Sequence, residues 1–205
     1  KGYDFATGLK SILRQDPDIV MVGEIRDPET ADIAINAALT GHLVISTIHT
    51  NSAAGSIPRL LSMGAKPFLL TPALDAIIGQ RLVRLLCQKC KVEAKLDEAT
   101  MTRVKKILSN LPDKTGYDAD TGKLKFYTAK GCVACNNLGY KGRIGIYEVL
   151  IVTPEVEKAM LKQNISESEV SEIAIASGMV TMVQDGVLKA LEGRTSLEEV
   201  FSVAE

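Results

Sequence analysis

The 205-residue sequence has no tryptophan, only 4% aromatic residues and two histidines. Its 24 basic and 25 acidic residues give a formal net charge of -1. Few aromatics and no basic excess argue against the stacking, phosphate-binding surface of a nucleic-acid-binding protein. Charged residues, glycine or proline interrupt every apolar run before the roughly 20 residues that a membrane helix needs, and no secretory leader opens the chain. We therefore expect a cytoplasmic protein without nucleic-acid partners.

The sequence has the composition of a folded globular protein, with 46% hydrophobic and 24% charged residues. Its length is enough for one domain and a second, smaller module. The chain begins with Lys1 and runs directly into an amphipathic pattern, so we interpret it as a piece of a longer protein.

Helix and strand patterns alternate over the first quarter of the chain. Apolar residues at three- to four-residue spacing predict a helix over 3–13 that ends before Pro17. An unbroken apolar run predicts a strand at 19–22 that is covered on both faces. A helix is predicted over 29–39 and a second strand over 43–46. This order, with short connections, predicts a parallel α/β sheet.

The rest of the sequence has mostly helical patterns. We expect helices over 52–63, 67–86 and 98–109, a loop over 112–122 and a β-like stretch over 124–128. Helix-start patterns are found at Thr153, Ser166 and Ser196. The predicted segments are an α/β block (1–86), a small cysteine-containing module (87–147) and a helical C-terminal subdomain (148–205).

All four cysteines lie in two Cys-x-x-Cys pairs, formed by Cys87 with Cys90 and by Cys132 with Cys135. Two such pairs can complete the closed tetrahedral ligand set of a structural zinc ion. The 41 residues between the pairs exceed the spacing of a compact zinc ribbon, so the ion would join two distant segments. The alternatives are a thioredoxin-like redox pair, which lacks its usual βαβ context here, and inert buried thiols. Disulfides are not expected in a cytosolic chain.

Chemically active side chains follow both predicted strands. Glu24 comes after the first strand, at the sheet edge where open α/β folds bind ligands. A Walker B carboxylate, which holds magnesium, has this position. Thr47 and His49 follow the second strand, where a hydroxyl and an imidazole could contact a γ-phosphate. The alternative is that Thr47 and Thr50 satisfy loop backbone groups while His49 only packs. His42 lies at the other end of the second strand.

Longer stretches around these residues resemble a known ATPase family. Segments 14–27 and 40–51 resemble the Walker B and His-box segments of secretion ATPases. The cysteine module and segment 139–148 are similar to the type II secretion ATPases and type IV pilus assembly ATPases. The likeness covers almost the whole chain, including 185–186 and 196–200. It implies a partial RecA-like ATPase core, a parallel sheet with helices, followed by a tetracysteine zinc-binding subdomain and a small helical C-terminal subdomain.

The resemblance also implies roles for individual residues. Glu24 would be the Walker B glutamate beside magnesium and the attacking water, and His49 the imidazole that senses the γ-phosphate of ATP. His42 would belong to the same box. Arg26 would support the nucleotide site or a subunit contact, and Arg81 would line the site. The four cysteines would be the zinc ligands.

The implied partners are copies of the chain in a homo-hexamer, an inner-membrane platform protein and a cytoplasmic adaptor of a secretion or pilus machine. The motor would lie in the cytoplasm, peripheral at the inner membrane. It would couple ATP hydrolysis to pseudopilus assembly and type II protein secretion, or to type IV pilus extension. The motifs do not distinguish these two.

One motif of such a motor is missing from the sequence. No G-x-x-x-x-G-K-[ST] segment, which would cradle the phosphates of ATP, is present. The family's N-terminal domain and Asp box are also absent. We therefore expect the 205-residue chain to lack ATPase activity by itself. An alternative from another class is a non-catalytic, zinc-stabilised protein-interaction module.

Overall fold

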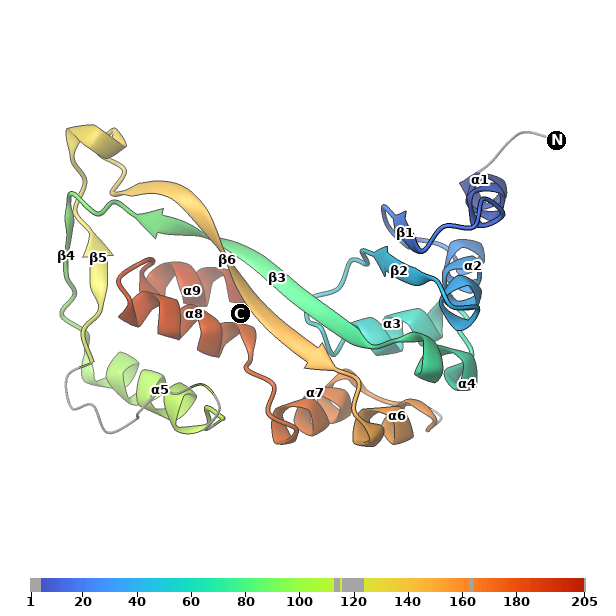
Figure 1. The fold of residues 1–205 in the computed structure, drawn as a ribbon. Coiled ribbons are helices and arrows are strands. Elements are labelled where there is room, and N and C mark those ends of the chain that lie inside the picture. Colours follow the sequence, from blue (N-terminus) through green and yellow to red (C-terminus); the bar gives the residue numbers. More distant parts are fainter. Residues whose placement is uncertain (1–4, 113–114, 116–123, 163, 205) are drawn as a thin grey trace. The chain divides into compact units, whose positions relative to one another are not determined.

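The computed structural model describes residues 5–112, 115, 124–162 and 164–204. The chain forms two compact units, which Figure 1 draws in sequence colours. The first unit comprises 1–77 and 150–177, and the second comprises 78–149 and 178–205. In the part of the chain that is described, no helix combines the length and the hydropathy needed to cross a bilayer.

A two-stranded parallel sheet and several helices make up the first unit. In chain order these elements are α1 (Phe5–Leu13), β1 (Ile19–Val22), α2 (Pro28–Leu39), β2 (Leu43–Ser46), α3 (Ser56–Ser62), α4 (Pro67–Leu70), the 3-10 helix η1 (Thr71–Ala73), α6 (Pro154–Met160) and α7 (Glu167–Ala176). Strands β1 and β2 pair in parallel, with Ile19 opposite Leu43 and Val22 opposite Ser46. The predicted helix–strand–helix–strand order is confirmed.

The start of α2 is fixed by its capping residue. Oδ1 of Asp27 accepts a hydrogen bond from the backbone N–H of Thr30 at 2.8 Å, and its Oδ2 accepts one from the Thr30 hydroxyl at 2.9 Å. These bonds, the backbone one foremost, hold the pKa of Asp27 below its usual value. Pro28 follows with a backbone angle already suited to a helix. The segment between β1 and α2 therefore has a defined end.

The described residues cover only one face of the β1–β2 sheet. The buried cluster on that face consists of Ala6, Leu9, Val20, Val22 and Ile33. On the other face Met21 is 79% exposed, and Ile19, Leu43 and Ile45 are also exposed. The prediction of a strand covered on both faces is therefore wrong for the described residues. Strand β1 alternates because its odd-numbered side chains point away from the cluster that α1 and α2 cover.

The described part of the second unit contains four strands and three α-helices. They are β3 (Ala76–Leu86), β4 (Lys91–Glu93), α5 (Glu98–Ser109), β5 (Tyr127–Ala129), the 3-10 helix η3 (Val133–Cys135), β6 (Tyr140–Ile151), α8 (Met182–Leu191) and α9 (Leu197–Ala204). The first residues of β3 and the last of β6 fall within the first unit. Strand β3 pairs with β6, and β4 pairs with β5 in antiparallel register. Helix α5 matches its predicted bounds.

The helix predicted over 67–86 is wrong. Only α4 and η1 are helical in that range, and β3 continues as a strand of eleven residues. Leucine, arginine and glutamine favour a helix locally, but pairing with β6 outweighs that weak preference. Strand alternation then buries Val83 and exposes Leu82. The helix predicted over 52–63 is shorter, because only α3 forms there.

The core of the second unit joins residues that are distant in sequence. Its buried members are Val104, Leu108, Phe126, Val187, Ala190, Leu197 and Val200, from α5, the segment before β5, α8 and α9. Helices α8 and α9 therefore pack in the second unit, whereas α6 and α7 belong to the first. The structure divides the segment 148–205 between the units, and the three predicted domains remain a prediction. Most of the loop expected over 112–122 lies outside the described residues.

Candidate functional site

The carboxyl ends of β1 and β2 bring an acid and an imidazole together. Glu24 lies two residues after β1, and His49 lies three residues after β2. Because parallel neighbours end at the same edge of a sheet, both side chains are presented there. Nε2 of His49 lies 3.2 Å from Oε2 of Glu24. The two residues are therefore direct neighbours in the fold.

Arg26 contacts the same carboxylate oxygen. Its Nε lies 2.6 Å from Oε2 of Glu24. The side chains of Arg26 and His49 are 70% and 83% exposed, whereas that of Glu24 is 33% exposed. Ion pairs this exposed contribute at most about 1 kcal/mol to stability. The contact therefore orients the carboxylate more than it stabilises the unit.

Thr47 fastens the two strand ends to each other. Its hydroxyl donates a hydrogen bond to the carbonyl oxygen of Gly23 at 2.7 Å. Its own carbonyl oxygen accepts one from the backbone N–H of Ile25 at 2.9 Å. These bonds bracket Glu24, so they hold the segment that carries the acid beside the segment that carries His49.

Two other predicted residues lie elsewhere. His42 precedes β2, at the end opposite His49, and its Nδ1 lies 3.0 Å from the carbonyl oxygen of Ala37 near the end of α2. Arg81 lies on β3 in the second unit, where it donates a hydrogen bond to the carbonyl oxygen of Gln80. Roles for His42 and Arg81 at a nucleotide site remain predictions.

A role for Asp27 was not predicted from the sequence, although it fixes the end of the segment that carries Glu24 and Arg26. Asp27 directly follows Arg26 and caps α2, which begins at Pro28. The signal was present, because aspartate before proline, with threonine three residues on, is a common helix start.

A second candidate site is the cluster of four cysteines in the second unit. All four Sγ atoms lie within 4.8 Å of one another, and the thiols are free. The Sγ separations are 3.9 Å between Cys87 and Cys132, 3.8 Å between Cys90 and Cys135, and 3.7 Å between Cys132 and Cys135. A tetrahedral ion with bonds of about 2.3 Å would separate its sulfur ligands by about 3.8 Å. The donor set and its geometry fit zinc.

Backbone groups shape the second cysteine pair. The N–H groups of Cys132 and Gly139 each donate to Sγ of Cys135 at 3.2 Å. Gly139 has a φ of +75°, and a Cβ there would lie 2.4 Å from Cβ of Ala129. A side chain at this position would push the turn away from β5. Glycine therefore permits the close approach that delivers the N–H to the thiol.

The thiols of Cys135 and Cys90 have different acidities. Burial disfavours the Cys135 thiolate, but the N–H groups of Cys132 and Gly139 outweigh it and lower the pKa to about 7. Burial, followed by a hydrogen bond with Cys132, raises the pKa of Cys90 to about 12. Cys135 is the thiol that ionises more readily, and a divalent ion would favour the thiolate form of all four.

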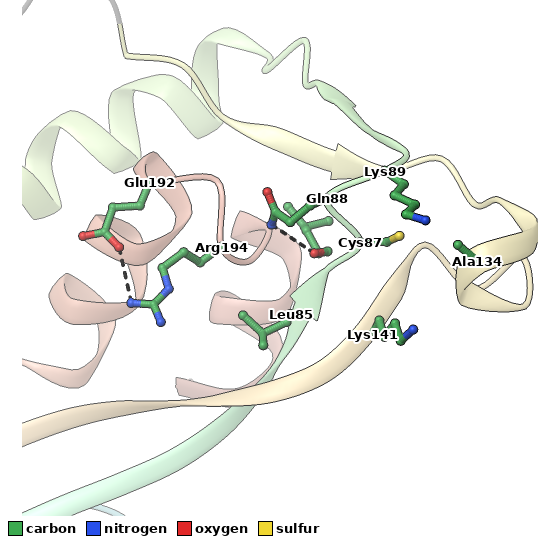
Figure 2. Close-up of a pocket in the computed structure, with 9 residues that line it drawn as sticks. Leu85, Cys87, Gln88, Lys89, Ala134, Lys141, Glu192 and Arg194 are labelled. Carbon is green, nitrogen blue, oxygen red and sulfur yellow. Dashed lines mark hydrogen bonds and ion pairs between the residues drawn. The ribbon is translucent and has the colours of Figure 1, made fainter.

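A pocket of about 520 Å³ lies beside Cys87 in the second unit (Figure 2). It is lined by Leu85, Leu86, Cys87, Gln88, Lys89, Ala134, Lys141, Glu192 and Arg194. This pocket was not predicted from the sequence, because its residues come from three segments more than 40 positions apart. The one signal of the pocket in the sequence is the positive charge of the segments that carry the cysteine pairs.

Comparison with known proteins identifies the family. Residues 1–202 match the family model described as type II/IV secretion system protein. The chain belongs to the type II/IV secretion system protein family. This secretion system protein is 49% identical, over 98% of its length, to the type IV pilus assembly ATPase PilB of Thermus thermophilus. It is 47% identical, over 97% of its length, to the type II secretion system protein E of Pseudomonas aeruginosa. The resemblance inferred from the motifs is confirmed.

The chain spans only part of the length of these relatives. It covers 21% of the Thermus thermophilus protein and 37% of the Pseudomonas aeruginosa protein. Among solved structures, the pilus retraction motor PilT with bound ADP matches at a TM-score of 0.62 and 25% identity, over 98% of this chain and 43% of that one. The Legionella pneumophila ATPase DotB matches at a TM-score of 0.63 and 21% identity, over 98% of this chain and 42% of that one. Both likenesses support an α/β ATPase fold.

Proposed function

We propose that this chain supplies one part of the nucleotide site of an ATP-hydrolysing motor that drives a secretion or pilus machine. The observation that carries the proposal is the contact of Glu24 with His49 at the ends of two neighbouring parallel strands. Relatives named as secretion and pilus assembly ATPases support it.

In this proposal, Glu24 acts as the Walker B carboxylate. It holds magnesium, directly or through water, and helps to order the attacking water. The His49 imidazole donates a hydrogen bond to the γ-phosphate. Arg26 balances the charge of Glu24 and keeps its carboxylate oriented, and Thr47 holds the two strand ends together. Electrostatic positioning of this kind supplies most of the catalysis in phosphoryl transfer.

The whole motor would act as a homo-hexamer in the cytoplasm, peripheral at the inner membrane. Its partners would be a membrane platform protein and a cytoplasmic adaptor. Phosphate loss would rotate domains around the ring and move pseudopilin or pilin subunits, for type II secretion or for pilus extension.

We also propose that the cysteine cluster holds one structural zinc ion. Cys87, Cys90, Cys132 and Cys135 would supply its four thiolate ligands. Four protein ligands leave no open position for substrate, so the bound ion would stabilise the fold by joining two distant segments. The relative orientation of the two cysteine turns would then be fixed.

Glu24→Gln tests the motor proposal in a longer protein that joins this chain to a P-loop segment. The substitution keeps the size of the side chain and removes its charge. We expect kcat for phosphate release from ATP to fall at least about 100-fold, with nucleotide affinity largely unchanged. The measurements are magnesium-dependent phosphate release and equilibrium nucleotide binding.

Glu29→Gln is the matched control. Glu29 is exposed on α2 and pairs with Lys10 at 3.2 Å, away from the strand ends. Its kcat should stay within about twofold of the parent. Full activity in Glu24→Gln would refute the role of Glu24. Magnesium-dependent turnover by the 205-residue chain alone, lost in Glu24→Gln, would refute the expectation that this chain is inactive by itself.

A further inference from the structure

The segments that carry the cysteine pairs differ in charge from the rest of the chain. Residues 84–92 and 125–147 contain seven lysine and arginine residues and no aspartate or glutamate. The whole chain has a net charge of -1. Positive charge is therefore concentrated around the cysteine cluster.

The pocket beside Cys87 gathers part of this charge. Lys89 lies in the turn of the first cysteine pair, Lys141 lies at the start of β6, and Arg194 lies between α8 and α9 (Figure 2). Glu192 is the one acidic residue among the described residues of the lining, and its Oε2 lies 3.6 Å from a guanidinium nitrogen of Arg194. The side chains of Lys89 and Lys141 have no ion-pair or hydrogen-bond partner among the described residues. Two unpaired ammonium groups therefore belong to one pocket.

The thiolates of the cluster do not cancel this charge. Four thiolates around one divalent ion carry a net charge of about -2. Of the seven basic residues on the two segments, Arg84 and Lys125 are paired with Glu199 and Glu93, which leaves five. Against the cluster, an excess of about three positive charges remains. The field at the pocket therefore attracts anions even when the metal site is fully ionised.

The rest of the lining is ordered and partly apolar. The Gln88 amide donates hydrogen bonds to the carbonyl oxygens of Leu86 and Gly193, at 3.1 and 3.3 Å. Leu85 and Ala134 add apolar surface. An acidic amino-acid side chain has the matching chemistry, a carboxylate on one or two methylene groups.

We propose that this pocket binds acidic side chains of a partner polypeptide. Its volume of about 520 Å³ suits one or two side chains that enter from a peptide. A bilayer surface would meet the exposed rim but would not fill a concavity. Lys89 and Lys141 would pair with the carboxylates. The site lies in the second unit, and the inference does not depend on the proposed ATPase activity.

The test measures binding of a fluorescently labelled hexaglutamate peptide to the zinc-loaded 205-residue chain by fluorescence anisotropy. We expect saturable binding that weakens as salt rises, and no binding of hexaglutamine. Lys89→Glu combined with Lys141→Glu should weaken binding at least about tenfold. Amide resonances of Gln88 and Arg194 should shift during the titration of the unsubstituted chain.

Lys105→Glu combined with Lys106→Glu is the matched control. Both lysines are exposed on α5 in the same unit, and the pair changes the net charge equally. Binding should stay within about twofold of the unsubstituted chain. An equal loss in this control would overturn the proposal, because net charge alone would then explain binding. So would failure of hexaglutamate to bind, including the case in which the chain binds phosphatidylglycerol vesicles instead.

Discussion

Oε2 of Glu24 lies 3.2 Å from Nε2 of His49, although the two residues are 25 positions apart in the sequence. The contact follows from the parallel register of β1 and β2, which ends both strands at one edge. Thr47 makes two hydrogen bonds on either side of Glu24, to Gly23 and Ile25. The position of the acid relative to the imidazole should therefore depend on Thr47.

We predict that Thr47→Val uncouples Glu24 from His49. Valine has nearly the same shape but lacks the hydroxyl that donates to Gly23, which should cost about 1 kcal/mol of unfolding free energy. The measurement is the shift of the His49 ring resonances on Glu24→Gln. We expect a large shift in the parent chain and a small one in the Thr47→Val background.

Thr47→Ser is the matched control, because it keeps the hydroxyl. The His49 shift on Glu24→Gln should then match that in the parent chain. An unchanged shift in Thr47→Val would mean that the strands alone position the two residues.

The meeting of Glu24 and His49 could be predicted because it depends on local patterns. Two short apolar runs, each followed by a polar break, indicated the strand ends that carry Glu24 and His49. The approach of Arg26 to Glu24 depends on the chain path after β1, which no periodicity records. The pocket was missed because Lys89, Lys141 and Arg194 meet only in the folded chain.

Zinc removal should loosen one part of the chain and leave another intact. Chelation would remove the ion that links the Cys87–Cys90 turn to the Cys132–Cys135 turn. We expect faster hydrogen exchange over 87–93 and 127–139, with unchanged protection in α2 of the first unit. Elemental analysis should find about one zinc per chain before chelation and none after.

Removal of a single cysteine ligand tests the same role of the zinc ion. Cys90→Ser should reproduce the effect of chelation in the presence of zinc, because it removes one of four ligands. Ser109→Ala, on the exposed end of α5, should leave zinc content unchanged. Unchanged hydrogen exchange over 87–139 after complete metal removal would exclude a structural role for the ion.

The errors in the predicted fold have one physical cause. The Leu- and Arg-rich run of β3 favours a helix within its own neighbourhood, and only pairing with β6, more than 50 residues later, makes it a strand. Likewise, the apolar run of β1 does not reveal which of its faces is covered. The starts of α2 and α7 were predicted to within a residue or two, because helix-start signals are local.

Gly186 in α8 should not tolerate a side chain. A Cβ there would lie 2.5 Å from Cγ1 of Val200, a fully buried, branched residue of α9. Gly186→Ala should therefore lower the unfolding free energy of the second unit by about 1 to 2 kcal/mol, even though alanine favours helices by about 1 kcal/mol. Urea unfolding followed by circular dichroism measures the loss.

A double substitution isolates this steric contact. Val200→Ala alone should destabilise by leaving a cavity, but it also makes room for a methyl group at Gly186. The loss in the double variant should therefore be at least about 1 kcal/mol smaller than the sum of the single losses. Strict additivity would show that the two helices separate without a clash.

Acid should weaken the attachment of α9 to β3 through Glu199. Its carboxylate accepts hydrogen bonds from the Arg84 guanidinium and, at 3.0 Å, from the Arg84 backbone N–H. The guanidinium contact, chiefly, holds the pKa of Glu199 below its usual value. Glu199 therefore stabilises the folded state fully above the unfolded pKa of about 4.3, and this contribution disappears as pH falls through the lower folded pKa.

At pH 7, Glu199→Gln should cost about 2 kcal/mol of unfolding free energy. The variant's unfolding free energy should also depend less on pH below about 4.5. Exposed Glu198→Gln should change neither quantity, and the same acid dependence in Glu199→Gln would contradict the assignment.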